Sequence, residues 1–248
     1  SVPRLHVITD DAILARPGFS RVASWLLEAG RDEVALHLRG PRTAGRSLYD
    51  HAQALLPTAR AHGALLVIND RLDVALAAGA DAVQLGARSL TLSDAREAVA
   101  RTVGSSPGSG EAASRQAGSG PAGSGQAASG QVASGQAATG QPGSRLRFGV
   151  SVHGVDEARE ALDADWWLVG TLWQTASHPG RPGAGVERLR DVGAAGPVPC
   201  IGIGGVTAER VAPAMRAGAA GVAVLGGIWH SPDPVTALNI YLEQGQDP

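Results

Sequence analysis

Residues 199–227 read PCIGIGGVTAERVAPAMRAGAAGVAVLGG, two short apolar runs with an amphipathic stretch between them. We predict strands over residues 199–203 and 221–225 and a helix over residues 208–217. Both predicted strands run into a pair of glycines. An apolar strand, a helix and a second apolar strand are typical of a parallel sheet that is buried on both faces. This segment therefore predicts an α/β fold.

The same alternation continues over most of the chain. Six further apolar runs predict strands at residues 5–8, 34–38, 65–68, 82–85, 146–152 and 166–169. Helix-like segments lie between them, at residues 19–29, 47–62, 71–78, 93–101, 156–163 and 186–192. Asp233-Pro234 opens a last helix, because a capping residue is followed there by proline at the first helical position.

Eight strand–helix pairs predict a single (β/α)8 TIM barrel over residues 1–248. An open, doubly wound sheet is the alternative, because periodicity alone does not show that a sheet closes. Residues 104–144 interrupt the pattern, since Gly, Ser, Ala and Gln dominate there and Val132 is the only large apolar side chain. Such a segment buries too little surface to offset the ordering of its backbone, which predicts a flexible, disordered insert between the fourth helix and the fifth strand. In a barrel this connection lies on the amino-terminal face, away from the chemistry.

The composition excludes several classes of protein. Of the 248 residues, 44% are hydrophobic, which is enough for a core. The net charge of -2, from 21 basic and 23 acidic residues, gives no general attraction to nucleic acid or to an anionic membrane. No apolar run approaches the roughly 18 residues that cross a bilayer, and no secretory signal is visible. We therefore expect a cytoplasmic protein with no nucleic-acid or membrane partner.

Two residue types narrow the possible chemistry further. All 21 basic residues are arginine, and without lysine both Schiff-base catalysis and a Walker-type phosphate loop are excluded. The single cysteine, Cys200, excludes an internal disulfide framework and a cysteine-based zinc cage.

In a barrel, functional side chains stand where the strands end. Those points carry Asp10, Arg39, Asn69, Asp70, Gln84, Ser151, His153, Thr171, Thr175, Gly204, Gly205, Gly226 and Gly227. Glycine lets backbone amides approach a ligand, and a helix N-terminus offers unpaired donors to an anion. The glycine pairs after the last two strands, the first followed by Thr207 as the expected N-cap, therefore predict a phosphate site. Tight turns are the alternative.

Three charged or titratable side chains among these have two interpretations each. An imidazole can take and return a proton near neutral pH, so His153 is the candidate proton carrier, whereas the alternative is a histidine that caps the next helix. Arg39 ends an apolar strand, so it meets either a structural carboxylate or an anionic substrate group. Asp70 is a Mg²⁺ ligand only if further carboxylates or phosphates lie nearby. His37, in the second strand, is placed to line the barrel.

Six segments of the sequence carry a resemblance to a known family. They are Leu5-His6-Val7-Ile8-Thr9-Asp10, Ile68-Asn69-Asp70-Arg71, Gly149-Val150-Ser151-Val152-His153, Val169-Gly170, Ile203-Gly204-Gly205 and Gly221-Val222-Ala223-Val224. In this order they resemble the thiamin phosphate synthase and TenI superfamily, over nearly the whole chain outside the insert. The resemblance implies a (β/α)8 barrel.

That superfamily has two branches. The synthase joins a pyrimidine diphosphate to a thiazole phosphate with Mg²⁺, and its pattern has Arg-Glu-Lys, Gly-Gln-x-Asp and Thr-x-Thr/Ser-Lys after the second, fourth and sixth strands. This chain has Arg39-Gly40-Pro41, Gly86-Ala87-Arg88-Ser89 and Thr175-Ala176-Ser177-His178 there. Both lysines and the second metal-binding aspartate are missing, and the loss of charge that neutralises a departing diphosphate should be severe. Asn69-Asp70 still matches the synthase.

The chain more closely resembles the TenI branch, the thiazole tautomerases. These isomerise a carboxylated dihydrothiazole-ylidene ethyl phosphate to the aromatic carboxythiazole phosphate, and the resemblance implies neither metal nor cofactor. It assigns proton transfer to His153. It assigns binding of the thiazole phosphate to Arg39, Asn69, Gln84, Ser151, Thr175, Ser177, Gly204, Gly205, Leu225 and Gly226. A homodimer is the candidate assembly.

Two other functions stay open at this point. One is a divergent thiamin phosphate synthase that keeps Asp70 and uses Mg²⁺. The other is a regulatory protein that binds a phosphorylated ligand in the same pocket and catalyses nothing.

Overall fold

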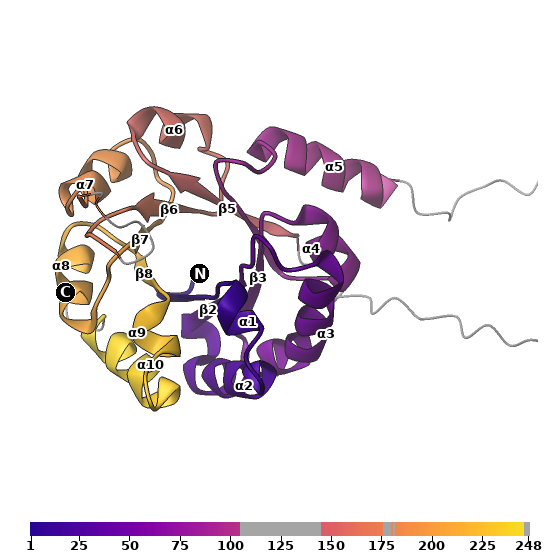
Figure 1. Cartoon of the computed structure of the whole chain (residues 1–248). Coiled ribbons are helices and arrows are strands. Elements are labelled where there is room, and N and C mark those ends of the chain that lie inside the picture. Colours follow the sequence, from indigo (N-terminus) through magenta and orange to yellow (C-terminus); the bar gives the residue numbers. More distant parts are fainter. Residues whose placement is uncertain (105–144, 176–179, 181, 246–248) are drawn as a thin grey trace, which may run out of the picture.

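The computed structural model describes residues 1–104, 145–175, 180 and 182–245. Eight parallel strands close into a barrel in chain order, with β1 hydrogen-bonded to both β2 and β8 (Figure 1). The strands are β1 Leu5–Ile8, β2 Val34–Leu38, β3 Leu65–Asn69, β4 Ala82–Leu85, β5 Arg147–Val152, β6 Trp166–Gly170, β7 Cys200–Ile203 and β8 Gly221–Val224. The predicted TIM barrel is confirmed, and the open sheet is excluded.

Helices form an outer ring around these strands (Figure 1). They are α1 Asp11–Leu14, α2 Phe19–Gly30, α3 Gly45–His62, α4 Leu72–Ala78, α5 Leu92–Gly104, α6 Val155–Glu160, α7 Glu187–Gly193, α8 Ala208–Arg216, α9 Gly226–Trp229 and α10 Pro234–Gln244. Asp233 caps α10 as predicted, since its side chain accepts from the backbone N–H groups of Val235 and Thr236. The short helices α1 and α9 follow β1 and β8 and were not predicted, because four residues carry no readable period.

The core has two parts on either side of the barrel wall. One lies between the strands and the helices, and includes Leu36, Leu66 and Trp167. The other fills the barrel and consists of Ile8, Ala35, Leu65, Val67, Ala82, Trp166, Leu168, Ile201 and Ala223. Buried polar side chains share this space, namely His6, His37, Asn69 and Gln84. The inside of the barrel is therefore mainly apolar, with polar side chains that run from His6 on β1 up to Asn69 and Gln84 near the carboxyl ends of β3 and β4.

The predicted insert begins one residue too early. Gly104 is the last residue of α5, so this helix continues past the predicted end at Arg101. Residues 105–144, the rest of the predicted insert, lie outside the described residues. The two ends that flank them are the C-terminus of α5 and the start of β5, which both belong to the amino-terminal face of the barrel.

We expect residues 105–144 to be replaceable by a short Gly-Ser linker. The chemistry of a barrel lies at the other face, and the cost of closing a loop changes slowly with its length. The free energy of unfolding should therefore change by about 1 kcal/mol or less. Urea unfolding followed by circular dichroism measures this, and a shortened chain that does not fold would contradict the assigned position of the segment.

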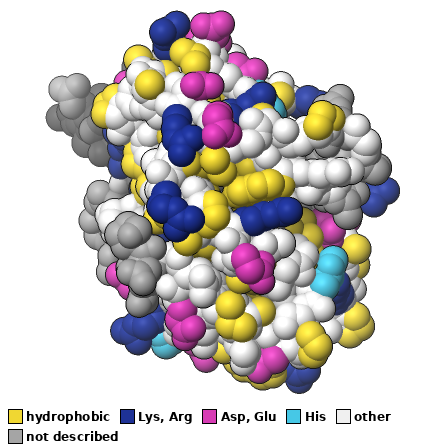
Figure 2. Space-filling view, turned by 90° about the vertical axis from the view of Figure 1, so that its left-hand side faces the viewer, with side chains coloured by type: hydrophobic (Ala, Val, Ile, Leu, Met, Phe, Trp, Pro, Cys, Tyr) yellow, Lys and Arg dark blue, Asp and Glu magenta, His cyan; other side chains and the backbone are white. Residues whose placement is uncertain are grey.

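Two observations describe the surface of the part of the chain that the structure covers. None of the described helices is both long and apolar enough to cross a membrane. On the face over α7 and α8, basic and acidic side chains are interspersed and no single charge dominates (Figure 2). This fits the small net charge of -2.

Candidate functional site

The polar end of the barrel is built by the last inward-facing residue of neighbouring strands. Alternate residues of a strand face the same side, so Asn69 faces inward like Val67, and Gln84 like Ala82. Asn69 and Gln84 are register partners on β3 and β4. Arg39 stands two residues beyond His37 and follows the same alternation. The strand ends thus bring predicted site residues to one mouth.

Gln84 is held in one orientation by its neighbours. Trp166 Nε1 donates to Gln84 Oε1 at 2.9 Å, and Gln84 Nε2 lies 3.2 Å from Ser151 Oγ, to which it donates. An indole N–H can only donate, so the amide of Gln84 cannot turn over. Because Ser151 Oγ accepts from Gln84, its own hydrogen is left to donate into the mouth. Gln84 is only 1% exposed, and it supports Ser151 from below.

A second buried chain of hydrogen bonds runs up the barrel to Asn69. His6 Nε2 lies 3.2 Å from the Pro3 carbonyl oxygen, and His6 Nδ1 lies 2.8 Å from His37 Nε2. His37 Nδ1 in turn lies 2.9 Å from Asn69 Oδ1. Both rings are fully buried, whereas Asn69 is 8% exposed. His37 therefore lines the barrel, as expected, and supports a residue at the mouth.

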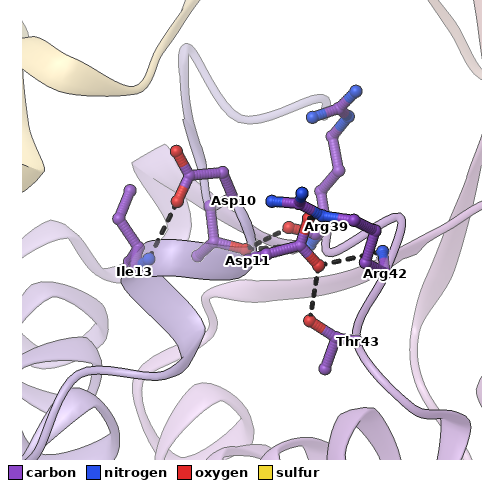
Figure 3. Close-up of polar contacts among 7 residues, drawn as sticks. Asp10, Asp11, Ile13, Arg39, Arg42 and Thr43 are labelled. Carbon is purple, nitrogen blue, oxygen red and sulfur yellow. Dashed lines mark hydrogen bonds and ion pairs between the residues drawn. The ribbon is translucent and has the colours of Figure 1, made fainter.

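The guanidinium of Arg39 has no partner in the part of the chain that the structure describes. Its backbone N–H donates to Thr9 Oγ1 at 2.9 Å, but its guanidinium makes no hydrogen bond or ion pair there. Figure 3 shows this side chain extending away from the contacts that Asp11 makes with Arg42 and Thr43. The structural carboxylate that one interpretation required is thus absent from the described residues. The other interpretation, an anionic group of a ligand, remains.

Asp10, another strand-end residue, has a structural role. Its Oδ1 accepts from the backbone N–H of Ile13 at 2.8 Å, which caps α1 (Figure 3). The same short helix presents Asp11, whose Oδ1 accepts from Thr43 Oγ1 at 2.8 Å. These contacts tie the loops after β1 and β2 together at the edge of the mouth.

Asp70 is occupied by neighbouring donors. It has a left-handed backbone, with φ 63°. Its Oδ1 accepts from the backbone N–H of Gly86 at 3.2 Å and from Ser89 Oγ. Ser89 stands where the family pattern has its second metal-binding aspartate, so a donor to Asp70 replaces a second carboxylate. Among the described residues, no three His, Cys, Asp or Glu side chains could hold a metal ion together.

His153 follows β5 and is bound to the first turn of the next helix. Glu157 Oε2 accepts from the backbone N–H of His153 at 2.7 Å and lies 3.1 Å from its Nδ1. The imidazole is 56% exposed. The carboxylate selects the tautomer with hydrogen on Nδ1, which leaves the lone pair of Nε2 free to take a proton. The backbone of His153 is tied to the helix start, and the role of its ring as a proton carrier stays a prediction.

The glycine pair after β7 packs closely against the loop after β6, and the phosphate site expected there stays a prediction. Gly204 and Gly205 have φ values of 101° and 63°, in the left-handed region. A Cβ on Gly204 would come within 2.5 Å of Thr171 Cγ2. Thr207 occupies the N-cap position of α8, but its side chain makes no capping hydrogen bond with the helix. The backbone amides of this loop are therefore available where a phosphate was expected.

Arg210 is a residue that the sequence reasoning missed. From the first turn of α8, its Nη1 donates to the Gly205 carbonyl oxygen at 2.6 Å, and its guanidinium lies 5.2 Å from the centre of the Trp173 ring. It holds the glycine loop against the loop after β6. A positively charged side chain in the first turn of a helix opposes the helix dipole. This unfavourable placement was the feature of the sequence that could have identified Arg210.

The remaining predicted site residues follow β6 and β8 in the sequence. Leu225 and Gly226 lie at the start of α9, after β8, and are half-buried. Thr175 is half-buried in the loop after β6. Ser177 lies outside the described residues. Direct contacts join Asn69 to His37 and Gln84 to Ser151, whereas the imidazole of His153 is hydrogen-bonded, among the described residues, to Glu157 alone.

We expect Gly204→Ala to weaken phosphate binding about tenfold or more. The added methyl group would meet Thr171, and φ 101° is strained for alanine. Calorimetric titration with a phosphorylated ligand measures the change. Gly218→Ala is the matched control, because it has φ 97° but nothing lies within 4 Å of its Cβ position. An equal loss in both variants would mean that backbone strain, and not the loop contact, is responsible.

Comparison with sequence families gives a match over most of the chain. Residues 5–136 and 130–228 match a family model described as "Thiamine monophosphate synthase". A thiamine-phosphate synthase of Salinispora arenicola is 32% identical over 249 residues, covering 98% of this chain and 97% of that protein. One from Methanoculleus marisnigri is 33% identical over 90% of this chain and 86% of that protein.

Comparison with solved structures supports the fold. A thiamine phosphate pyrophosphorylase from Pyrococcus furiosus has a TM-score of 0.71 at 23% identity, over 98% of this chain and 96% of that one. A phosphoribosyl anthranilate isomerase from Thermotoga maritima reaches a TM-score of 0.59 at 13% identity, over 99% and 100%. At these identities the likeness concerns the barrel alone.

Proposed function

Because the chain belongs to the thiamine monophosphate synthase/TenI family, we propose that it acts on a phosphorylated thiazole precursor of thiamine as a tautomerase. The reaction is the isomerisation of a carboxylated dihydrothiazole-ylidene ethyl phosphate to the aromatic carboxythiazole phosphate. A proton leaves the ring carbon that bears the carboxylate, and a proton is added to the exocyclic alkylidene carbon. The atoms balance without a co-reactant, and aromaticity supplies the driving force.

The observation that carries this proposal is the contact between His153 and Glu157. A base that transfers a proton needs a free lone pair and a fixed ring, and Glu157 supplies both conditions by accepting from Nδ1 at 3.1 Å. Such a pair is sufficient for proton transfer without a metal.

The rest of the mouth provides binding. Gly204 and Gly205, with Leu225 and Gly226, take the phosphate through backbone amides, and Thr175 and Ser177 assist them. Arg39 takes the carboxylate, since an unpaired guanidinium is the strongest carboxylate receptor at the mouth. Asn69 and Ser151 contact the ring, with Gln84 holding Ser151 in place.

The second candidate is the synthase reaction, which the names of the curated relatives favour over the tautomerase. Mg²⁺ fits the site poorly, however. Asp70 Oδ1 already accepts two hydrogen bonds, and Ser89 replaces the second carboxylate. Mg²⁺ is usually held by one or two carboxylates together with phosphates. We therefore derive no catalytic step through this metal.

One experiment separates the candidates. The purified protein is offered the ylidene phosphate with EDTA, and separately the pyrimidine diphosphate and thiazole phosphate with Mg²⁺. Aromatisation in the presence of EDTA supports the tautomerase, whereas coupling that needs Mg²⁺ and is lost in Asp70→Asn replaces it with the synthase. Binding of the thiazole phosphate without turnover in either assay would point to a regulatory protein.

A further inference from the structure

The hydrogen-bond chain beneath the mouth has only one consistent direction when its two imidazoles are neutral. It consists of the Pro3 carbonyl, His6, His37 and Asn69, joined by contacts of 3.2, 2.8 and 2.9 Å. Each contact must contain one donor and one acceptor, because an unpaired polar group inside the barrel is costly.

The lower end fixes the direction. The Pro3 carbonyl can only accept, so His6 must carry its hydrogen on Nε2. Burial, and after it the neighbouring His37, lowers the pKa of His6 well below its ordinary value. Arg147 acts in the same direction, and the Pro3 carbonyl opposes it. Burial lowers the pKa of His37 to about 4, although the hydrogen bond with Asn69 opposes this. Both rings are therefore neutral near pH 7, with one hydrogen each.

The hydrogen on His6 then determines which atom donates in each contact above it. With hydrogen on Nε2, His6 offers a lone pair at Nδ1, so His37 must donate to it from Nε2. His37 is left with a lone pair at Nδ1, which needs a donor. That donor can only be the amide of Asn69, which must turn over so that Nδ2 takes the place of Oδ1 beside His37. The two arms of an amide have nearly the same shape, so hydrogen bonding decides between them.

We propose that His6 and His37 are positioning residues, which hold the Asn69 amide so that its carbonyl oxygen faces the mouth. The other arm of this amide has no hydrogen-bond partner among the described residues, and Asn69 is 8% exposed. The mouth therefore presents an acceptor at Asn69 on β3 and the hydroxyl hydrogen of Ser151 on β5.

The opposite orientation of the Asn69 amide would be coupled to protonation of the two histidines. If a ligand anion drew Nδ2 of Asn69 toward the mouth, every contact in the chain would reverse. His6 Nε2 would then face the Pro3 carbonyl without a hydrogen unless the pair took up a proton. The orientation of the Asn69 amide rests on this chain of hydrogen bonds alone.

Nuclear magnetic resonance of protein labelled with ¹⁵N-histidine tests the orientation without any ligand. We expect both His6 and His37 at pH 7 to be neutral, with hydrogen on Nε2. His6→Phe and His37→Phe identify the two signals. A hydrogen on Nδ1 of His37, or a charged ring in either residue, would overturn the proposal. Asn69→Asp should change the position of the hydrogen or the charge in both rings, because a carboxylate cannot donate to His37. His6 does not touch Asn69, so a change in its signal would show that the two histidines are coupled through their hydrogen bond.

Discussion

Replacing His153 by asparagine should lower kcat by about 10²–10⁴-fold while leaving the affinity for a phosphorylated ligand nearly unchanged. Asparagine can still accept or donate a hydrogen bond, but it has no basic nitrogen that takes a proton near neutral pH. Steady-state assay of the isomerisation measures kcat, and calorimetric titration measures the affinity.

Two further variants make this result specific. His62 is the last residue of α3 and lies at the amino-terminal face of the barrel, so His62→Asn should retain full activity. Glu157→Gln keeps an acceptor for the ring but removes the charge, so we expect a loss of about tenfold. Near-normal turnover in His153→Asn would show that His153 takes no part in the mechanism and only contacts the start of the helix.

Trp166→Ala should lower the free energy of unfolding by about 3–5 kcal/mol. The side chain is fully buried inside the barrel, and its Nε1 donates to Gln84 Oε1 at 2.9 Å. Removing it leaves a cavity and also frees the amide of Gln84, so ligand affinity should fall in the fraction that remains folded. Urea unfolding gives the free energy.

Matched tryptophan variants separate the contributions. Trp25 is 48% exposed on α2, so Trp25→Ala should cost about 1 kcal/mol or less. Trp166→Phe keeps most of the volume but removes the donor, and the unpaired Gln84 Oε1 should cost about 1–3 kcal/mol. Equal stability in the two alanine variants would show that the barrel interior repacks around the missing indole.

The sequence predicted those structural features that depend on a single strand. The bounds of β1, β2 and β4 were predicted to the residue, because a polar side chain follows β1 and β2, at Thr9 and Arg39, and a glycine follows β4, at Gly86. Alternation along a strand also indicates which side chains share a face. For this reason most of the predicted site residues do stand at the strand ends.

Contacts across the barrel could not be predicted in this way. Trp166 and Gln84 belong to β6 and β4, with β5 between them, and nothing in their local sequences indicates that the indole reaches the amide. The same is true of His6, which looked like an ordinary strand residue and is the lower link of the chain to Asn69. Pairing of this kind depends on the closure and tilt of the barrel, which fix which inward side chains meet.

The closure of the sheet also bears on how the protein behaves in concentrated solution. A net charge of -2 provides little mutual repulsion between copies. An open sheet would carry two edge strands, whose unpaired N–H and C=O groups are templates for joining another chain. Here β1 and β8 satisfy each other. Resistance to aggregation through strand addition therefore comes from the geometry of the backbone, and mutations at the mouth can alter the charge of the protein without exposing an edge.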